Sequence, residues 1–410
     1  MGSIKTIIIG TLSEPIPPKY YGGIEEIIYF IVEGLLKKGW YIYLIDIDDD
    51  FRRDLTKFGK ITRNDKFKMV RIPVIASTRN TILMLRGLVA LAKTINLIKK
   101  DSTIIVHSFY YYPLFPLTLF LKFLSKIEHS NIKVIYTTAA HYPWLARQVK
   151  FRSKLTYPFR KLMKDYADII VTLSEPMVKS ISLNLNIPKN KFRVIHDCYD
   201  DEEYDYRNIE IQKLQKMAEN FKKNTGLKDK LIILYLARLQ SEKGIDDLLQ
   251  ALELLKSLCS HNFHRLKVII AGKTNDKTLQ KYKSMIKRKN LDNVVTIVGN
   301  KPRIVVKFLY TLADLYILPT KLEAGPPISL LQAIGSGTPA ITTKYSLIPE
   351  LLRLSHSVID KPIAKNLARK IYYFLIHKQE LRMMWEKEYI IVKKYYGKSY
   401  CVSKYLEVYV

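Results

Sequence analysis

The sequence predicts an α/β protein made of two successive domains, each with a doubly wound parallel sheet. Short apolar runs alternate with segments of helical hydrophobic spacing along most of the chain, which is the order that helix-covered parallel sheets require. A polar and charged stretch interrupts this alternation once, over residues 196–230. The 410 residues, 48% of them apolar, also suffice for two cores of ordinary size.

Each series of elements begins with a strand. In the first series we expect a helix at 23–38 and strands at 5–10, 41–47, 102–107, 133–138 and 168–173. In the second series we expect strands at 231–237, 267–272, 294–299, 315–318 and 340–342. These patterns predict an N-terminal Rossmann-like domain over 1–203 and a C-terminal one over 204–379. A helical tail, 380–410, is expected to pack back on the first domain, with a ligand cleft between the domains.

Cysteine usage and hydropathy indicate the compartment. The three cysteines, Cys198, Cys259 and Cys401, are far apart and form no CxxC pair, which fits a reducing compartment and neither a disulfide framework nor a zinc site. The first residues have the pattern of a strand rather than of a signal peptide. No apolar window reaches the length of a membrane-spanning helix. We therefore expect a cytoplasmic protein.

The net charge of +29 is divided almost equally between residues 1–200 and 201–410, but within the first half one region carries most of the basic excess. Residues 51–160 hold 21 basic and 4 acidic side chains. They include an apolar helix pattern with basic edges at 78–100. Such a helix suits an anionic membrane surface, although a core helix with a solvated basic edge has the same pattern. A basic field also attracts nucleic acid, but no nucleic-acid-binding motif accompanies it. Two interpretations therefore stay open: peripheral contact with the inner face of the cell membrane, and a core helix with a solvated edge.

The segment 313–343 has the pattern of a ligand-binding βα unit. It contains a buried strand, a polar loop with one acid and a Gly-Pro-Pro turn, an apolar helix and another strand. Open α/β sheets hold ligands at the carboxyl ends of their strands. The unpaired N–H groups and the dipole of the following helix favour a phosphate. We therefore predict a phosphorylated ligand near Glu323 and Gly325.

Two further turns carry groups that suit an anion. Gly22 and Gly23 separate the first strand from the first helix, and paired glycines let the backbone approach an anion closely. Their spacing is not that of the GxGxxG fingerprint, which disfavours an NAD enzyme. Arg238 and Lys243 follow the first strand of the second domain, so both could reach a diphosphate. Two cations there would remove the need for a metal ion.

An Asp-x-Asp pair occurs at Asp46 and Asp48. Some metal-dependent sugar transferases hold a divalent cation with such a pair, since carboxylates are the ligands of hard cations. Here the pair directly follows an apolar run, so we interpret it as the polar end of the second strand. No metal site is predicted.

Six segments together carry a resemblance to a known family. They are YYGGIEEIIYFIVEGLLKKGW, ADIIVTLSEPM, FRVIHDCYD, LARLQSEKGIDDLLQAL, KVIIAG and EAGPPISLLQAIGSGTP, in this order. In this respect the chain resembles the retaining glycosyltransferase family 4 (glycosyl transferases group 1), which has the GT-B fold of two Rossmann-like domains. The resemblance implies a nucleotide-sugar as co-substrate, no other cofactor, no metal, and transfer with retention of configuration.

The resemblance also implies roles for individual residues. Arg238 and Lys243 would grip the donor diphosphate, and Gly22 and Gly23 would approach it from the N-terminal domain. His141, in TTAAHYPW, would lie near the sugar or the acceptor, although a lone histidine is more often structural.

The family signature is a pair of glutamates separated by seven residues, and this chain departs from it twice. Gln332 takes the place of the second glutamate, which binds ribose. Ala324 takes the register of the first, which contacts the donor sugar, with Glu323 one residue earlier. An amide can still hydrogen-bond ribose hydroxyls, but it loses charge assistance of about 1 kcal/mol. Glu323 would contact the sugar, and the loop at Gly325 and Pro326 would contact the donor.

Three functional hypotheses remain open. The first is retaining transfer of a sugar to an acceptor hydroxyl, with lipid-linked or anionic acceptors among the candidates and the leaving phosphate oxygen accepting the proton. The second is a catalytically weak or inactive GT-B protein that binds a nucleotide-sugar or a partner, suggested by Ala324 and Gln332. The third is a membrane-surface or nucleic-acid-binding protein that reuses the fold. The sequence does not specify the sugar, the base, the acceptor or the oligomeric state.

Overall fold

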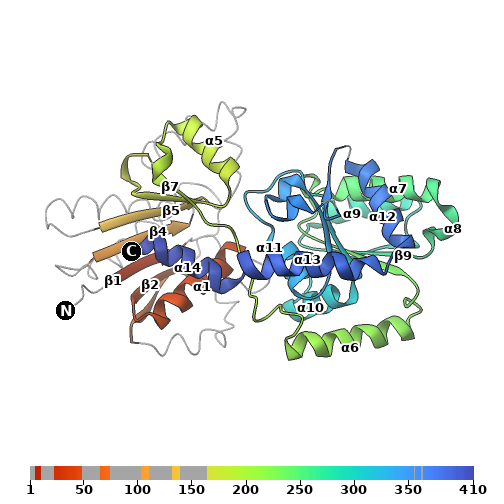
Figure 1. Cartoon of the computed structure of the whole chain (residues 1–410), viewed down its shortest axis with the longest axis horizontal. Helices are drawn as coiled ribbons and strands as arrows, with labels where there is room; N and C mark the ends of the chain where they lie inside the picture. Colours follow the sequence, from red (N-terminus) through yellow and green to blue (C-terminus); the bar gives the residue numbers. More distant parts are fainter. Residues whose placement is uncertain are drawn as a thin grey trace. The chain divides into compact units, whose positions relative to one another are not determined.

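A computed structural model describes residues 5–10, 23–48, 65–73, 103–109, 132–138, 164–354, 356–361 and 363–410. The chain forms two compact units (Figure 1): the first unit is Met1–His196 with Cys401–Val410, and the second unit is Asp197–Tyr400. The division therefore falls after His196 rather than after residue 203. Tyr199 and Tyr204 already belong to the buried core of the second unit, and the Tyr199 amide donates to the Tyr396 carbonyl at 3.1 Å.

The first unit is built on a seven-stranded sheet in the order β3-β2-β1-β4-β5-β6-β7. All neighbouring strands are parallel, and the order reverses between β1 and β4. The strands are β1 (Lys5–Gly10), β2 (Tyr41–Asp48), β3 (Phe67–Pro73), β4 (Thr103–Phe109), β5 (Ile132–Thr138), β6 (Ile169–Thr172) and β7 (Phe192–Val194). The described helices include α1 (Gly23–Lys37) and α5 (Glu175–Leu185).

The predicted strands of this unit are confirmed within two residues at each end, but β3 and β7 were not predicted. Both are edge strands. β3 contains Lys68, Arg71 and Pro73, residues typical of sheet edges rather than of buried runs. Its register places Asp46 opposite Arg71 and Asp48 opposite Pro73. The Asp-x-Asp pair is thus the polar end of β2, as predicted.

The end of α14 (Lys398–Tyr409) packs on the sheet of the first unit (Figure 1). His107 is fully buried on β4, with Nδ1 2.6 Å from the Tyr409 hydroxyl and Nε2 2.7 Å from Thr137 Oγ1. Burial lowers the pKa of His107 to about 3, so the imidazole is neutral. Lys133 Nζ donates to the Val408 carbonyl at 2.7 Å. Of the tail expected to pack on the first domain, residues 401–410 do so, whereas 380–400 belong to the second unit.

The second unit has a six-stranded sheet in the order β10-β9-β8-β11-β12-β13, again with all neighbours parallel. The strands are β8 (Leu231–Leu236), β9 (Leu266–Ala271), β10 (Val295–Gly299), β11 (Leu315–Leu318), β12 (Ala340–Thr343) and β13 (Val358–Ile359). Every residue of β8, β11 and β12 is buried, as expected for a parallel sheet with both faces covered. The five strands predicted here are confirmed, and only the two-residue β13 was not predicted.

Helices cover both faces of this sheet (Figure 1). The helices are α6 (Ile209–Asn224), α7 (Ile245–Leu258), α8 (Ser260–Phe263), α9 (Asp276–Arg288), α10 (Arg303–Leu312), α11 (Ile328–Gly335), α12 (Ile363–Ile376) and α13 (Glu380–Tyr395). α12 packs on α7, α6 on α10, and α13 on α11. The sheet order reverses between β8 and β11, because β9 and β10 lie on one side of β8 while β11 to β13 lie on the other.

A buried carboxyl group joins α13 to the sheet. Glu388 is fully buried. Its Oε2 accepts from the Ala340 amide at 2.9 Å, and its Oε1 accepts from Ser357 Oγ at 2.6 Å. Burial raises the pKa of Glu388 to about 8, although both hydrogen bonds favour the ionised form.

We predict that Glu388 makes the second unit less stable as pH rises. In the unfolded chain this carboxyl ionises near pH 4.5, whereas in the folded state it keeps its proton until about pH 8. Its contribution to the free energy of unfolding is therefore fully present below about pH 4.5. As the pH rises towards 8, this contribution is lost by up to about 1.4 kcal/mol per pH unit. Glu388→Gln should flatten the free energy of urea unfolding measured between pH 5 and 8. Glu386→Gln, at an exposed site on the same helix, is the control. A wild-type slope in Glu388→Gln would contradict the assignment.

Candidate functional site

The candidate site lies at the carboxyl ends of β8 and β11. These strands pair in parallel, with Leu315 opposite Ile233 and Tyr316 opposite Leu234, so their carboxyl ends share one edge of the sheet. The loop 237–244 leads from β8 into α7, and the loop 319–327 leads from β11 into α11. In open α/β sheets ligands bind where the strand order reverses, which is this edge.

The two loops approach each other closely at Gly244. This residue has φ of 77°, and a Cβ placed on it would lie 1.9 Å from the Pro319 carbonyl oxygen. Only glycine fits both the left-handed conformation and the contact. The Lys321 amide also donates to the Glu242 carbonyl at 2.7 Å. The spacing between the two loops is therefore fixed by backbone atoms.

An ion pair connects the two loops. Lys243 Nζ lies 2.7 Å from both carboxylate oxygens of Glu323. Thr320 Oγ1 donates to Oε1 of the same carboxylate at 2.8 Å. The side chains of Lys243 and Glu323 are 18% and 10% exposed, so solvent screens this pair less than it screens a surface ion pair. Two residues predicted separately from the sequence thus meet in one site.

The hydroxyl of buried Tyr235 connects the backbone at Arg238 with the backbone at Lys243. The Tyr235 hydroxyl lies 3.5 Å from the Arg238 carbonyl and 3.4 Å from the Lys243 carbonyl. Burial raises the pKa of Tyr235 well above its usual value, so the hydroxyl keeps its proton as a donor. Arg238 itself is exposed. Its guanidinium makes no ion pair with any part of the chain that the structure describes. Among the described residues, Arg238 therefore forms no ion pair, whereas Lys243 is paired with Glu323.

Sequence reasoning missed a second carboxyl group in the site. Burial and the Glu323 carboxylate raise the pKa of Asp197 to about 7. Asp197 lies in the FRVIHDCYD segment, which the polar composition identified only as a domain boundary. The pattern therefore contained the residue but gave no sign that it lies near Glu323. Thr320 is only three residues before Glu323, and it was missed because the sequence does not show where its hydroxyl points.

The loop that follows Glu323 leads into α11. Gly325 and Pro326 are buried, and no side chain caps the N-terminus of α11. Gln332, within α11, is only 4% exposed, and its Oε1 accepts from the Tyr310 hydroxyl at 3.2 Å. This bond uses one of the two lone pairs of the amide oxygen. The NH₂ group and the second lone pair remain for the predicted contact with ribose.

Several predicted site residues belong to the first unit. Gly23 is the first residue of α1 and is exposed. Gly22 and His141 lie outside the described residues, as do the helix expected at 78–100 and most of the basic region 51–160.

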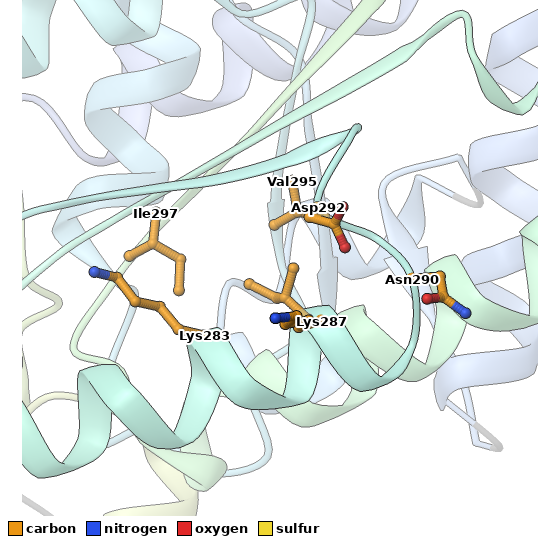
Figure 2. A pocket seen from close by; sticks show the side chains of 7 residues that line it. Lys283, Lys287, Asn290, Asp292, Val295 and Ile297 are labelled. Carbon is orange, nitrogen blue, oxygen red and sulfur yellow. The ribbon is translucent and has the colours of Figure 1, made fainter.

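A surface depression elsewhere in the second unit contains none of the predicted residues (Figure 2). It lies between α9 and the edge strand β10. Its lining residues are Lys283, Ile286, Lys287, Asn290, Asp292, Val295 and Ile297. The connection from α9 to β10 lies at the amino ends of the strands, opposite the edge that carries Lys243 and Glu323.

Two family models match successive parts of the chain. Glycosyltransferase Family 4 matches residues 21–203, and Glycosyl transferases group 1 matches residues 216–390. The chain belongs to the glycosyltransferases of family 4, also described as glycosyl transferases group 1.

Individual relatives are distant in sequence. An uncharacterized glycosyltransferase of Methanocaldococcus jannaschii, MJ1607, is 26% identical over 45% of this chain and 44% of its own length. The amylovoran biosynthesis glycosyltransferase AmsK of Erwinia amylovora is 30% identical over 32% of each chain. The chain thus spans less than half the length of these relatives.

Solved structures of similar fold cover the whole chain. A glycosyltransferase from Rickettsia africae has a TM-score of 0.74 at 18% identity and covers 100% of this chain and 98% of its own. The Anabaena protein HepE, solved in complex with UDP, has a TM-score of 0.71 at 14% identity and covers 98% of this chain and 99% of its own. These structures establish the GT-B fold of two α/β domains.

We predict that the close approach at Gly244 costs more to disturb than a left-handed glycine alone. Gly226 has φ of 66° with nothing within 4 Å of its added Cβ, so Gly226→Ala should cost about 1 kcal/mol. Gly244→Ala must also separate the Pro319 carbonyl from its neighbour, and should cost about 3 kcal/mol or more. Urea unfolding of both variants measures the difference. Equal losses would show that the loops are not held at this spacing.

Proposed function

We propose that this protein is a retaining glycosyltransferase that moves a sugar from a nucleotide-sugar to an acceptor hydroxyl without a metal ion. The observation that carries the proposal is the ion pair between Lys243 and Glu323 at the sheet edge where β8 and β11 end, with the exposed Arg238 in the same loop as Lys243. Family membership supports it. Because HepE has been solved with UDP and with UDP-glucose, uridine donors are the first to test.

The donor diphosphate would bind between the loops that follow β8 and β11. Arg238 supplies an exposed guanidinium, which suits phosphate oxygens through paired N–H donors. Lys243 supplies a second cation, and the uncapped N-terminus of α11 supplies backbone amides. Two cations and a helix N-terminus together stabilise the negative charge of a leaving diphosphate, which is the role a metal ion plays in other transferases.

In the proposed reaction the bond between the anomeric carbon and the phosphate oxygen breaks, and its electron pair stays on the diphosphate. The acceptor oxygen forms its bond to the same face of the anomeric carbon. The acceptor proton passes to the leaving phosphate oxygen, so no protein nucleophile is needed. Glu323 would orient the sugar hydroxyls, and the Gln332 amide would donate to the ribose. We assign most of the donor binding to the second unit. In the first unit, Gly22 and Gly23 would approach the donor diphosphate, and His141 would lie near the sugar or the acceptor.

We predict that Arg238→Ala loses transfer without losing stability. The side chain is exposed, so its removal should leave the melting temperature nearly unchanged. Loss of a donor to the leaving diphosphate should lower kcat/KM by about 100-fold. Arg288→Ala, at an exposed arginine in the last turn of α9, is the matched control. A panel of nucleotide-sugars, selected by thermal stabilisation, supplies the donor.

The assays contain EDTA, and the anomeric configuration of the product is read by NMR. Activity that requires added Mn²⁺, or an inverted product, would contradict the corresponding part of the proposal. Specific stabilisation by a nucleotide-sugar without transfer to any acceptor would favour the alternative, a non-catalytic GT-B protein. Unchanged transfer by Arg238→Ala would remove the assignment of the site.

We also propose that the enzyme works at an anionic membrane surface and on a lipid-linked or other anionic acceptor. The support is the net charge of +29, with 21 basic and 4 acidic residues over 51–160. Among the described residues no helix is long and apolar enough to span a bilayer, so the proposal concerns surface binding.

We predict that the protein sediments with vesicles containing about one third anionic lipid and not with neutral vesicles. Binding should weaken between 50 and 300 mM salt, on the order of tenfold or more, because the attraction is electrostatic. Duplex DNA at matched salt is the comparison. Tighter binding to DNA than to vesicles, or equal binding to neutral and anionic vesicles, would contradict the proposal.

A further inference from the structure

The ion pair between Lys243 and Glu323 occupies two groups that the proposed reaction needs for different partners. Lys243 is needed by the diphosphate, and Glu323 by the sugar. In the structure both carboxylate oxygens lie 2.7 Å from the ammonium, so two of the three N–H donors of Lys243 are committed. A diphosphate must therefore compete with Glu323 for this lysine.

We propose that donor binding proceeds by exchange of this ion pair, and that Thr320 is the residue that positions Glu323 once Lys243 has moved to the diphosphate. The inference deepens the proposed function and rests on it. It adds a resting state, in which the site is locked by its own carboxylate, and a positioning residue outside the predicted set.

The two carboxylate oxygens of Glu323 differ in their partners. Oε1 accepts from both Lys243 Nζ and Thr320 Oγ1, whereas Oε2 pairs with Lys243 alone among its hydrogen bonds to described residues. When Lys243 turns to a phosphate, Oε1 stays held at 2.8 Å by Thr320. Oε2 becomes the free acceptor for a sugar hydroxyl. Sugar orientation thus becomes available only after the phosphate has bound.

Thr320 is well placed to hold the carboxylate. It is fully buried. Its hydroxyl lies 2.8 Å from Glu323 Oε1 but 3.3 Å from the carbonyls of Glu242 and Leu322. The single hydroxyl proton therefore goes to the nearest and only charged acceptor. Thr343 Oγ1 in turn donates to the Thr320 carbonyl, which fixes Thr320 from the end of β12.

Charge in the site allows the exchange. Arg238 is exposed and bears no carboxylate partner among the described residues, so it can attract the diphosphate first. Lys243 is 18% exposed and sits five positions further along the same loop, so its ammonium can follow. Burial and the Glu323 carboxylate raise the pKa of Asp197 to about 7, so this carboxyl is only partly ionised at neutral pH.

The experiment separates binding from transfer. Thr320→Val keeps the shape of the side chain but removes the hydroxyl. We expect kcat to fall about tenfold or more, as for loss of a hydrogen bond to a charged group, while the Kd for the nucleoside diphosphate is unchanged or lower. Thr320→Ser should restore kcat. Thr342→Val is the matched control, because Thr342 is equally buried and its hydroxyl donates only to the Leu318 carbonyl, at 3.0 Å. It should lose stability but keep kcat.

The competition between Glu323 and the diphosphate for Lys243 is tested by binding measurements without turnover. Glu323→Gln frees Lys243 from a carboxylate, so calorimetric binding of the nucleoside diphosphate selected from UDP, GDP, ADP and TDP should tighten several-fold. Lys243→Met should weaken it. Unchanged or weaker binding in Glu323→Gln, or equal kcat in Thr320→Val and Thr342→Val, would overturn the exchange while Arg238→Ala still supports the proposed function. Absence of binding by every nucleotide would overturn both.

Discussion

The pairing of β8 with β11 is the constraint on which the candidate site depends. Because these strands are parallel and adjacent, with Tyr316 opposite Leu234, the loops that follow them leave the sheet at one edge. Gly244 then lets the first loop lie against the Pro319 carbonyl of the second. Within this spacing the Lys243 ammonium reaches the Glu323 carboxylate at 2.7 Å. A substitution that widens the gap would leave a partly buried carboxylate without its cation, which is costly.

The same geometry accounts for the departures from the family signature. At the register of the family's first glutamate this chain has Ala324, and Glu323, which we propose takes over the sugar contact, lies one residue earlier. The Glu323 carboxylate pairs with the Lys243 ammonium and accepts a hydrogen bond from the Thr320 hydroxyl. The second departure has a different outcome. Gln332 is buried within α11 and accepts a hydrogen bond from the Tyr310 hydroxyl, which links α11 to α10. The two signature positions therefore differ in environment: the first lies in a loop beside a cation, and the second lies inside a helix.

The two units use their buried polar groups for different purposes. In the first unit, neutral His107 links β4 to β5 and to the end of the chain through Thr137 and Tyr409. In the second unit, Glu388 links α13 to β12. Both groups have their hydrogen bonds satisfied away from solvent, so their pKa values reflect structure rather than catalysis. The groups around Glu323 differ, because Arg238 and Lys243 remain accessible to an anion.

The sequence by itself determined the fold class and the order of the buried strands along the chain, and it marked Arg238, Lys243 and Glu323 as candidate site residues, because apolar runs and loop residues are local patterns. Edge strands such as β3 were not predicted from the sequence, because charged residues and proline obscure the strand pattern there. Only the tertiary structure decided that Lys243 pairs with Glu323, that Thr320 and Asp197 belong to the same site, and that Gln332 is turned towards Tyr310. Each of these contacts joins residues far apart in the chain or depends on which way a side chain points. Local residue spacing specifies neither the contacts between distant residues nor the direction of a side chain.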